Sequence, residues 1–182
     1  MGENFLAIDF ETANYAGDSA CAIGLVKVRK GKITDQEVFL IRPPSRDFVF
    51  TYIHGISWAN VEKAPTFGKL WPKLEPFFEG IDFLAAHNAS FDRKVLFACC
   101  STYKISPPTH PFTCTVQLAR KHFGIYPTKL SDVCRRLKIN LKHHEALSDA
   151  TACAKIVLAA SAGRNPGAPA KLPKKTVRNA TI

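Results

Sequence analysis

The sequence has no long apolar run. None of its uninterrupted apolar stretches approaches the roughly 18 residues of a membrane-spanning helix, so we expect no membrane-embedded segment. It has six cysteines but no C-x-x-C pair, which argues against a zinc ribbon. Most of these cysteines stand in apolar segments, which is typical of buried thiols in a reducing compartment. Residues 1–4 lack the basic start of a secretion signal, and we therefore expect a cytoplasmic protein.

Acidic residues are scarce relative to basic ones. The chain has 25 Lys and Arg against 15 Asp and Glu, a net charge of +10. This balance indicates a polyanionic partner, most commonly nucleic acid, although a solvated basic surface is the simpler alternative. Residues 161–182 contain five basic residues, no acidic ones and few large apolar ones. We therefore expect one domain over residues 1–160, followed by a basic, disordered tail.

The hydrophobic pattern predicts an α/β fold that begins with strands. Short apolar or alternating runs predict strands at residues 5–10, 20–29 and 33–41, with a tight turn at residues 31–32. These three strands should form an antiparallel meander.

The rest of the chain alternates strands with helices. Two further strands are expected, at residues 82–86 and 112–114. Helical spacing predicts helices at residues 66–78, from a cap at Ser90 onward, and at residues 115–122, 130–137 and 146–160. Together these elements indicate a mixed sheet, an antiparallel meander plus parallel strands, flanked by helices.

Carboxylates stand among apolar residues in three short segments, at residues 8–12, 87–92 and 144–149. A buried carboxylate is costly unless it is paired or coordinates a metal. Asp9 and Glu11 are two residues apart on a predicted strand, so both should point to the same face. If the fold joins the three segments, the carboxylates repel one another and bound divalent cations relieve that repulsion.

The second and third segments contain groups suited to catalysis. Asp92 falls in the first turn of a predicted helix, where the helix dipole by itself favours a negative charge. His144 and Asp149 would lie about 140° apart on one ideal helix, so we place His144 in the loop before the helix and Asp149 on it. A neutral imidazole there is a suitable general base, with the adjacent His143 as a competitor. An all-carboxylate site favours Mg²⁺ or Mn²⁺ over Zn²⁺.

Five residues in this order carry a family resemblance: Asp9, Glu11, Asp92, His144 and Asp149. They resemble the signature of the DEDDh-type 3′–5′ exonucleases, the family that includes the proofreading ε subunit of bacterial DNA polymerase and RNase T. The resemblance covers residues 4 to about 160. It implies a ribonuclease H-like fold, two Mg²⁺ or Mn²⁺ ions held by the four carboxylates, and His144 as the general base.

The resemblance also implies a binding site for the terminal nucleotide. Thr12, Ile23 and His54 match positions near the terminal sugar and base, whereas Asn88 and Phe91 match positions that support the site. The expected substrate is nucleic acid with a free 3′ end, single-stranded DNA being favoured, and the products are nucleoside 5′-monophosphates.

Several alternatives stay open at this point. Many family members continue the first motif with Thr-Gly, whereas this chain has Ala13-Asn14, which leaves the choice between DNA and RNA open. A non-catalytic nucleic-acid-binding module on the same fold is a further alternative, which the intact five-residue set disfavours. A polymerase or another replication protein is a candidate partner.

Overall fold

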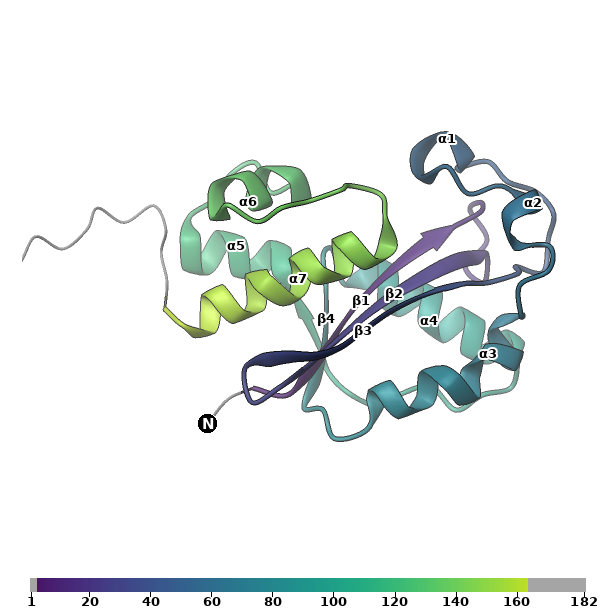
Figure 1. The fold of residues 1–182 in the computed structure, drawn as a ribbon, viewed down its shortest axis with the longest axis horizontal. Helices are drawn as coiled ribbons and strands as arrows, with labels where there is room; N and C mark the ends of the chain where they lie inside the picture. The colour runs from purple at the N-terminus through teal and green to yellow at the C-terminus, as the bar shows by residue number, and fades with distance from the viewer. Residues whose placement is uncertain (1–2, 164–182) are drawn as a thin grey trace, which may run out of the picture.

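The computed structural model describes residues 3–163, and its centre is a five-stranded mixed sheet (Figure 1). The strand order is β3-β2-β1-β4-β5. The strands are β1 (Phe5–Thr12), β2 (Ala20–Arg29), β3 (Lys32–Leu40), β4 (Phe83–Ala86) and β5 (Phe112–Cys114). The first three pair antiparallel, and β4 and β5 continue parallel to β1. The predicted ribonuclease H-like mixed sheet is therefore confirmed. The predicted basic tail lies outside the described residues from residue 164 onward.

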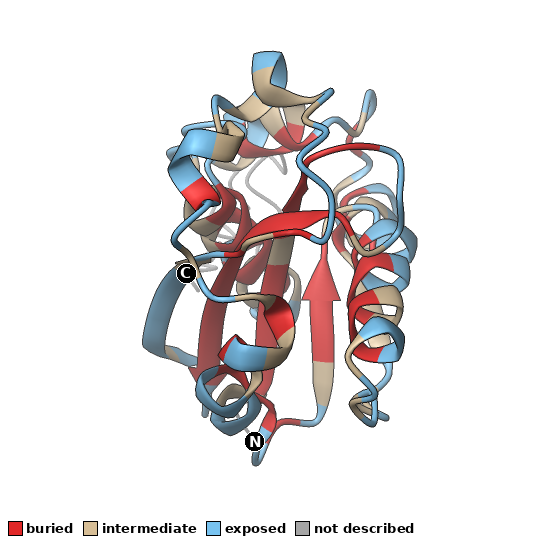
Figure 2. Cartoon of the chain, turned by 90° about the vertical axis from the view of Figure 1, so that its right-hand side faces the viewer, coloured by how far each residue is buried: buried red, intermediate tan, exposed pale blue. Residues whose placement is uncertain are grey.

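Helices cover both faces of the sheet. They are α1 (Thr51–His54), α2 (Trp58–Val61), α3 (Phe67–Leu74), the 3₁₀ helix η1 (Glu75–Phe78), α4 (Ser90–Thr102), α5 (Thr115–Phe123), α6 (Leu130–Leu137) and α7 (Ala146–Ser161). Because side chains alternate along β1, Leu6 and Ile8 pack toward α3 and α4, whereas Phe5 and Ala7 pack toward α7. Strands β1, β2 and β4 are accordingly buried, whereas most of the edge strand β3 is exposed. Figure 2 shows the buried strands in red between helices whose outer faces are exposed. No helix in residues 3–163 is long and apolar enough to cross a membrane.

One turn and one helix start differ from the predictions by one residue. The β2–β3 turn consists of Lys30 and Gly31, with φ values of 51° and 74°, so Lys32 already belongs to β3. Positive φ at both central residues is typical of the type I′ turn, whose twist matches that of the paired strands. At the start of α4, Ala89 is the capping residue and Ser90 is the first helical residue.

The predicted helix at residues 66–78 is divided into α3 and η1. Thr66 caps α3 by accepting a hydrogen bond from the backbone N–H of Lys69. The 3₁₀ helix begins at Glu75, with Pro76 in its first turn, where the missing proline N–H costs little. The strand β1 also runs past the predicted end at Phe10, because its pairing with β2 continues to Thr12.

Gly24 lets α7 approach the sheet closely. This residue lies on β2 directly opposite Asp9 of β1. A Cβ atom built on Gly24 would collide with the backbone at Ala146, the first residue of α7. Only a residue without a side chain therefore allows the start of α7 to lie against β2 beside Asp9.

Candidate active site

A cleft of about 480 Å³ opens at the carboxyl end of β1. It is bounded by the end of β1, the short helix α1, the first turn of α4, and the loops that precede α6 and α7. The lining side chains are Asp9, Phe10, Glu11, Thr12, Phe50, Ile53, His54, His87, Phe91, Lys129, Leu130, His143, His144 and Asp149. Five segments that are separate in the sequence thus contribute acidic, basic and aromatic groups to one cavity.

Three of the predicted carboxylates converge in this cleft. Asp9, Glu11 and Asp149 each offer an oxygen atom, and these atoms all lie within 4.8 Å of one another. Asp92 lies beneath them, is almost fully buried and does not line the cleft. Its Oδ1 accepts a hydrogen bond of 3.0 Å from the backbone N–H of Phe10, which ties the start of α4 to β1.

The convergence makes the ionised state of these groups costly. Burial, followed by the charges of Asp92, Asp149 and Glu11, raises the pKa of Asp9 well above its ordinary value. Burial likewise raises the pKa of Glu11 to about 8 and the pKa of Asp92 to about 7. The Oδ1 atom of Asp149 is buried and has no hydrogen-bond partner among the described residues. Crowded carboxylates with an unpartnered oxygen fit divalent cations with oxygen ligands, such as Mg²⁺ or Mn²⁺.

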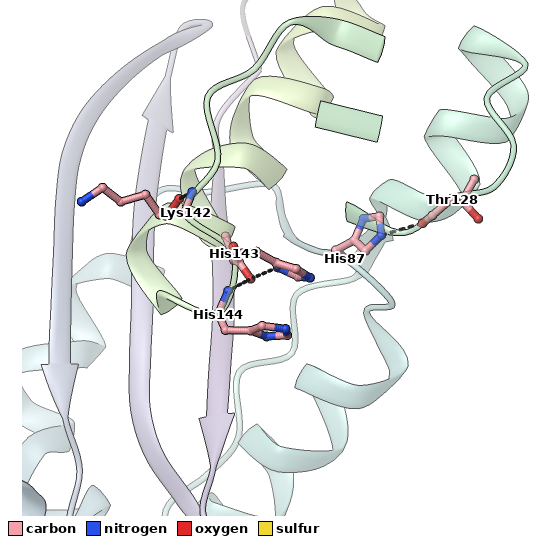
Figure 3. Close-up of polar contacts among 7 residues, drawn as sticks. His87, Thr128, Lys142, His143 and His144 are labelled. Carbon is pink, nitrogen blue, oxygen red and sulfur yellow. Dashed lines mark hydrogen bonds and ion pairs between the residues drawn. The ribbon is translucent and has the colours of Figure 1, made fainter. Parts of the chain in front are cut away.

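The two histidines before α7, His143 and His144, both contact the Oδ2 atom of Asp149 (Figure 3). The Nδ1 atom of His143 lies 3.0 Å from Asp149 Oδ2, and the backbone N–H of His144 donates to the same oxygen at 3.1 Å. The two rings stack with their centroids 3.8 Å apart. The backbone of His144 is left-handed, with a φ of 66°, which is uncommon for a residue with a side chain. As predicted, His144 lies in the loop and Asp149 lies on α7.

The two histidines differ in what their rings contact. His143 uses Nδ1 against Asp149, whereas the ring of His144 makes no hydrogen bond within residues 3–163. Partial burial, and then the neighbouring His143, lower the pKa of His144, so its ring is neutral near pH 7. His143, His144 and Asp149 also lie close enough to share one ion, but the two carboxylates nearby favour a harder cation than Zn²⁺.

Thr12, His54 and Phe91, three of the five residues predicted to bind or support the terminal nucleotide, line the cleft. The backbone N–H of Ile56 donates to His54 Nδ1 at 3.0 Å, so Nε2 carries the proton and donates to the carbonyl of Thr12 at 3.1 Å. Burial lowers the pKa of His54, in keeping with this neutral tautomer. The loop that follows α1 is thereby fixed to the end of β1.

The other two residues that were predicted to bind or support the terminal nucleotide, Ile23 and Asn88, do not line the cleft. Ile23 is fully buried in the core and pairs with Phe10 across β1 and β2, because its side chain points to the α3–α4 face. Asn88 is exposed in a left-handed turn, with a φ of 65°, and its Oδ1 accepts a hydrogen bond from Ser90 Oγ. In this structure it shapes the entry to α4 rather than facing the cavity.

Two polar cleft residues, His87 and Lys129, were missed by the sequence analysis, as were the apolar Phe50, Ile53 and Leu130. His87 Nε2 donates to the carbonyl of Thr128 at 2.9 Å (Figure 3). Its Nδ1 accepts from Thr115 Oγ1 at 2.8 Å. The ring thus fixes the loop that carries Lys129 into the cleft. The position of His87 at the start of the second motif segment was a usable signal, whereas nothing in the local pattern distinguishes Lys129.

Comparison with known proteins agrees with this geometry. Residues 6–157 match the model of the RNase T exonuclease family. The chain is 32% identical over 155 residues to exodeoxyribonuclease 10 of Escherichia coli K12, an alignment that covers 78% of this chain and 61% of that protein. It is 28% identical over 155 residues to the PolC-type DNA polymerase III of Bacillus cereus, covering 82% of this chain but only 11% of the polymerase.

A solved structure extends the likeness to three dimensions. It is exonuclease X in complex with 5′ overhanging duplex DNA, with a TM-score of 0.66 and 27% sequence identity. The match covers 89% of this chain and 95% of that one.

Proposed function

Since the chain belongs to the exonuclease family, we propose that it removes nucleoside 5′-monophosphates from the 3′ end of single-stranded DNA. The convergence of Asp9, Glu11 and Asp149 beside His144 in one open cleft is the observation that carries this proposal. DNA is favoured over RNA because the relatives above 25% identity are named as an exodeoxyribonuclease and a DNA polymerase. The alignment covers only 11% of that polymerase. Membership of the exonuclease family therefore does not imply a polymerase partner, which we include only as part of this proposal.

We call Asp9, Glu11 and Asp149 at the base of the cleft, together with Asp92 beneath them, the floor. These four carboxylates serve as the metal site in this proposal. Asp9, Glu11 and Asp149 offer oxygens toward the cleft. Asp92 is the fourth ligand in this proposal, because it is near enough for its charge to add to burial in raising the pKa values of Asp9 and Glu11. These residues would hold two divalent cations, which would supply electrostatic stabilisation of the phosphoryl charge and a more acidic water. The raised pKa values of Asp9, Glu11 and Asp92 support this assignment, because a cation restores the ionised state that burial disfavours.

His144 acts as the general base. Its ring is neutral near pH 7 and lines the cleft, so a ring nitrogen accepts the proton of the attacking water. His143 is a positioning residue in this scheme, because its Nδ1 is engaged with Asp149 Oδ2. The same oxygen accepts from the backbone of His144, so one carboxylate fixes both histidines.

The opposite wall of the cleft receives the terminal nucleotide. His54 holds the backbone of Thr12 with its Nε2 and has its Nδ1 occupied by Ile56, so Thr12 supplies the polar group for the terminal sugar and His54 positions it. Phe50, Ile53 and Phe91 offer apolar surface on which a base stacks without regard to its identity. In this proposal the 3′-terminal nucleotide is held between these apolar side chains and the carboxylates, so a free 3′ end is the expected substrate.

The proposal is tested with 5′-labelled DNA and RNA of one sequence, each single-stranded and duplex, in Mg²⁺ or Mn²⁺. We expect a ladder of single-nucleotide steps from the 3′ end of single-stranded DNA, no reaction in EDTA, and none with a 3′ block or a circular strand. Asp149→Asn is the inactive control. Undiminished cleavage in EDTA contradicts the metal site, and cleavage of circles contradicts the end-binding pocket. Faster cleavage of RNA would assign the alternative, an exoribonuclease with the same chemistry.

A further inference from the structure

The positive charge of the described chain is concentrated in one segment. Between Asp92 and Asp132 there is no acidic residue, whereas residues 3–92 contain 12 acidic and 9 basic ones. The basic residues of the segment are Arg93, Lys94, Lys104, Arg120, Lys121 and Lys129. The segment forms most of α4, the edge strand β5 and α5, so it occupies the β5 edge of the sheet.

Part of this segment forms a groove that leads away from the catalytic cleft. Arg93 and Lys94 lie four and three residues before Phe97, so each of them neighbours Phe97 on the surface of α4. Together with Ser90 they line a hollow of about 360 Å³. Arg93 and Phe97 also line a second hollow of about 530 Å³, whose other wall is residues 107–112. We call these two hollows the α4 groove.

The groove starts at the same end of α4 as the catalytic cleft. Phe91, which lines the cleft, and Ser90, which lines the groove, are neighbours in the first turn of α4. From Phe91 to Phe97 the helix rises by about 9 Å. A strand whose 3′ end lies in the cleft can therefore pass the first turn of α4 and enter the groove.

The side chains of the groove suit single-stranded nucleic acid. Neither Arg93 nor Lys94 forms an ion pair with a carboxylate among residues 3–163, so both charges are available to phosphates. The Arg93 guanidinium lies 5.1 Å from the centre of the Phe97 ring, and this pair offers a cation next to an aromatic face. Backbone-tracking cations combined with stacking surfaces are typical of sites that bind single strands without sequence preference.

The opposite edge of the sheet lacks these properties. The edge strand β3 exposes Asp35 and Glu37, which repel phosphates. Given the proposed exonuclease function, we propose that the α4 groove binds the substrate strand upstream of its 3′ end, so that the strand leaves the cleft over the β5 edge.

The test compares a long substrate with a dinucleotide, which is too short to extend far beyond the cleft. The double variant Arg93→Gln/Lys94→Gln is measured against wild type with a DNA oligonucleotide about 12 nucleotides long. We expect the ratio of kcat/KM for the long substrate to kcat/KM for the dinucleotide to fall roughly tenfold. The control Lys32→Gln/Lys73→Gln also removes two exposed charges, from β3 and α3, and should keep the wild-type ratio.

Binding of the labelled oligonucleotide, followed by fluorescence anisotropy, separates the two proposals. If wild type binds the oligonucleotide but cleaves neither substrate, the exonuclease proposal fails, while weaker binding by Arg93→Gln/Lys94→Gln still supports the groove. An unchanged ratio together with unchanged binding overturns the groove as a nucleic-acid site and leaves an acidic protein segment as its occupant. An equal loss on both substrates also overturns it, because the effect would then act inside the cleft.

Discussion

The floor of the cleft and the basic segment at residues 93–131 carry opposite charges in opposite environments. On the floor, burial raises the pKa values of Asp9, Glu11 and Asp92, and repulsion by neighbouring carboxylates adds to the shift at Asp9 and Glu11. In the basic segment, Arg93 and Lys94 are exposed on the surface of α4. Salt screens buried charges very little, so they require a specific counterion nearby. Exposed positive charges instead attract a polyanion weakly and over a longer distance. We therefore expect the floor to determine the rate of the chemical step and the basic segment to determine affinity.

Removing one floor carboxylate should produce the largest effect. Asp149→Asn removes the carboxylate whose Oδ1 has no hydrogen-bond partner among the described residues. We expect kcat to fall by more than about 10⁴-fold, because bound cations lower the activation free energy of such reactions by several kcal/mol. The measurement is single-turnover cleavage of single-stranded DNA in saturating Mg²⁺. Circular dichroism melting checks that the variant is folded. A loss of less than tenfold would remove Asp149 from the metal site.

The histidines should differ in the size of their effects. His144→Ala should lower kcat about 10²–10⁴-fold, the usual contribution of a general base. His143→Ala should cost about 10–100-fold, because it removes only a group that orients Asp149. In the wild type, the lowered pKa of His144 should keep kcat independent of pH from about pH 7 upward and let it fall in acid. If His143→Ala is the more damaging change, the two roles are reversed.

The metal-free protein should lose stability as the pH rises. Glu11 has an ordinary pKa of 4.5 and a folded-state pKa of about 8, so the folded state binds the proton more tightly than the unfolded state. Its contribution to the free energy of unfolding is complete below pH 4.5 and is lost as the pH rises to about 8.

This pH dependence is measured as Tm in EDTA between pH 5 and pH 8.5. Glu11→Gln should flatten the decline and raise Tm at the upper end of the range. Mg²⁺ or Mn²⁺ at about 100 times its Kd adds about 2.7 kcal/mol, or roughly 5–10 °C in Tm. A Tm that is unaffected by either cation at pH 8 contradicts the metal site.

The loop that carries Lys129 links the two regions and should respond moderately to mutation. His87→Ala removes the hydrogen bonds to Thr115 and Thr128, and we expect the free energy of unfolding to fall by about 1–3 kcal/mol. The matched control is His122→Ala, which changes an exposed histidine on α5. Urea denaturation measures both variants. Equal stability of the two variants would show that His87 does not fix the loop.

The smallest effect concerns salt. Arg93→Gln/Lys94→Gln should reduce the slope of log K against log salt concentration by about 1.4, because each single-strand phosphate contact contributes about 0.7. Fluorescence anisotropy at four salt concentrations measures the slope. A floor variant such as Asp149→Asn should leave this slope near the wild-type value, and a matching change there would erase the distinction between the two regions.

The sequence predicted the sheet and most of the floor from local patterns. Alternation along β1 placed Asp9 and Glu11 on one face and Phe10 on the other, because strand geometry has a period of two. The five-residue spacing placed His144 before α7 and Asp149 on it. The turn at Lys30 and the division of the helix at residues 66–78 were missed, since one-residue shifts and proline breaks depend on pairing and packing around them.

The five motif residues followed from the sequence alone, but the rest of the site and its shape did not. Periodicity is a property of the backbone, so the residue types, their order and their faces can be deduced from the chain. Convergence is a property of packing. Only the fold decided that Gly24 admits α7 beside Asp9, that Ile23 turns into the core, and that His87 and Lys129 join the cleft. These contacts join residues far apart in the chain, and no local pattern encodes which distant groups meet.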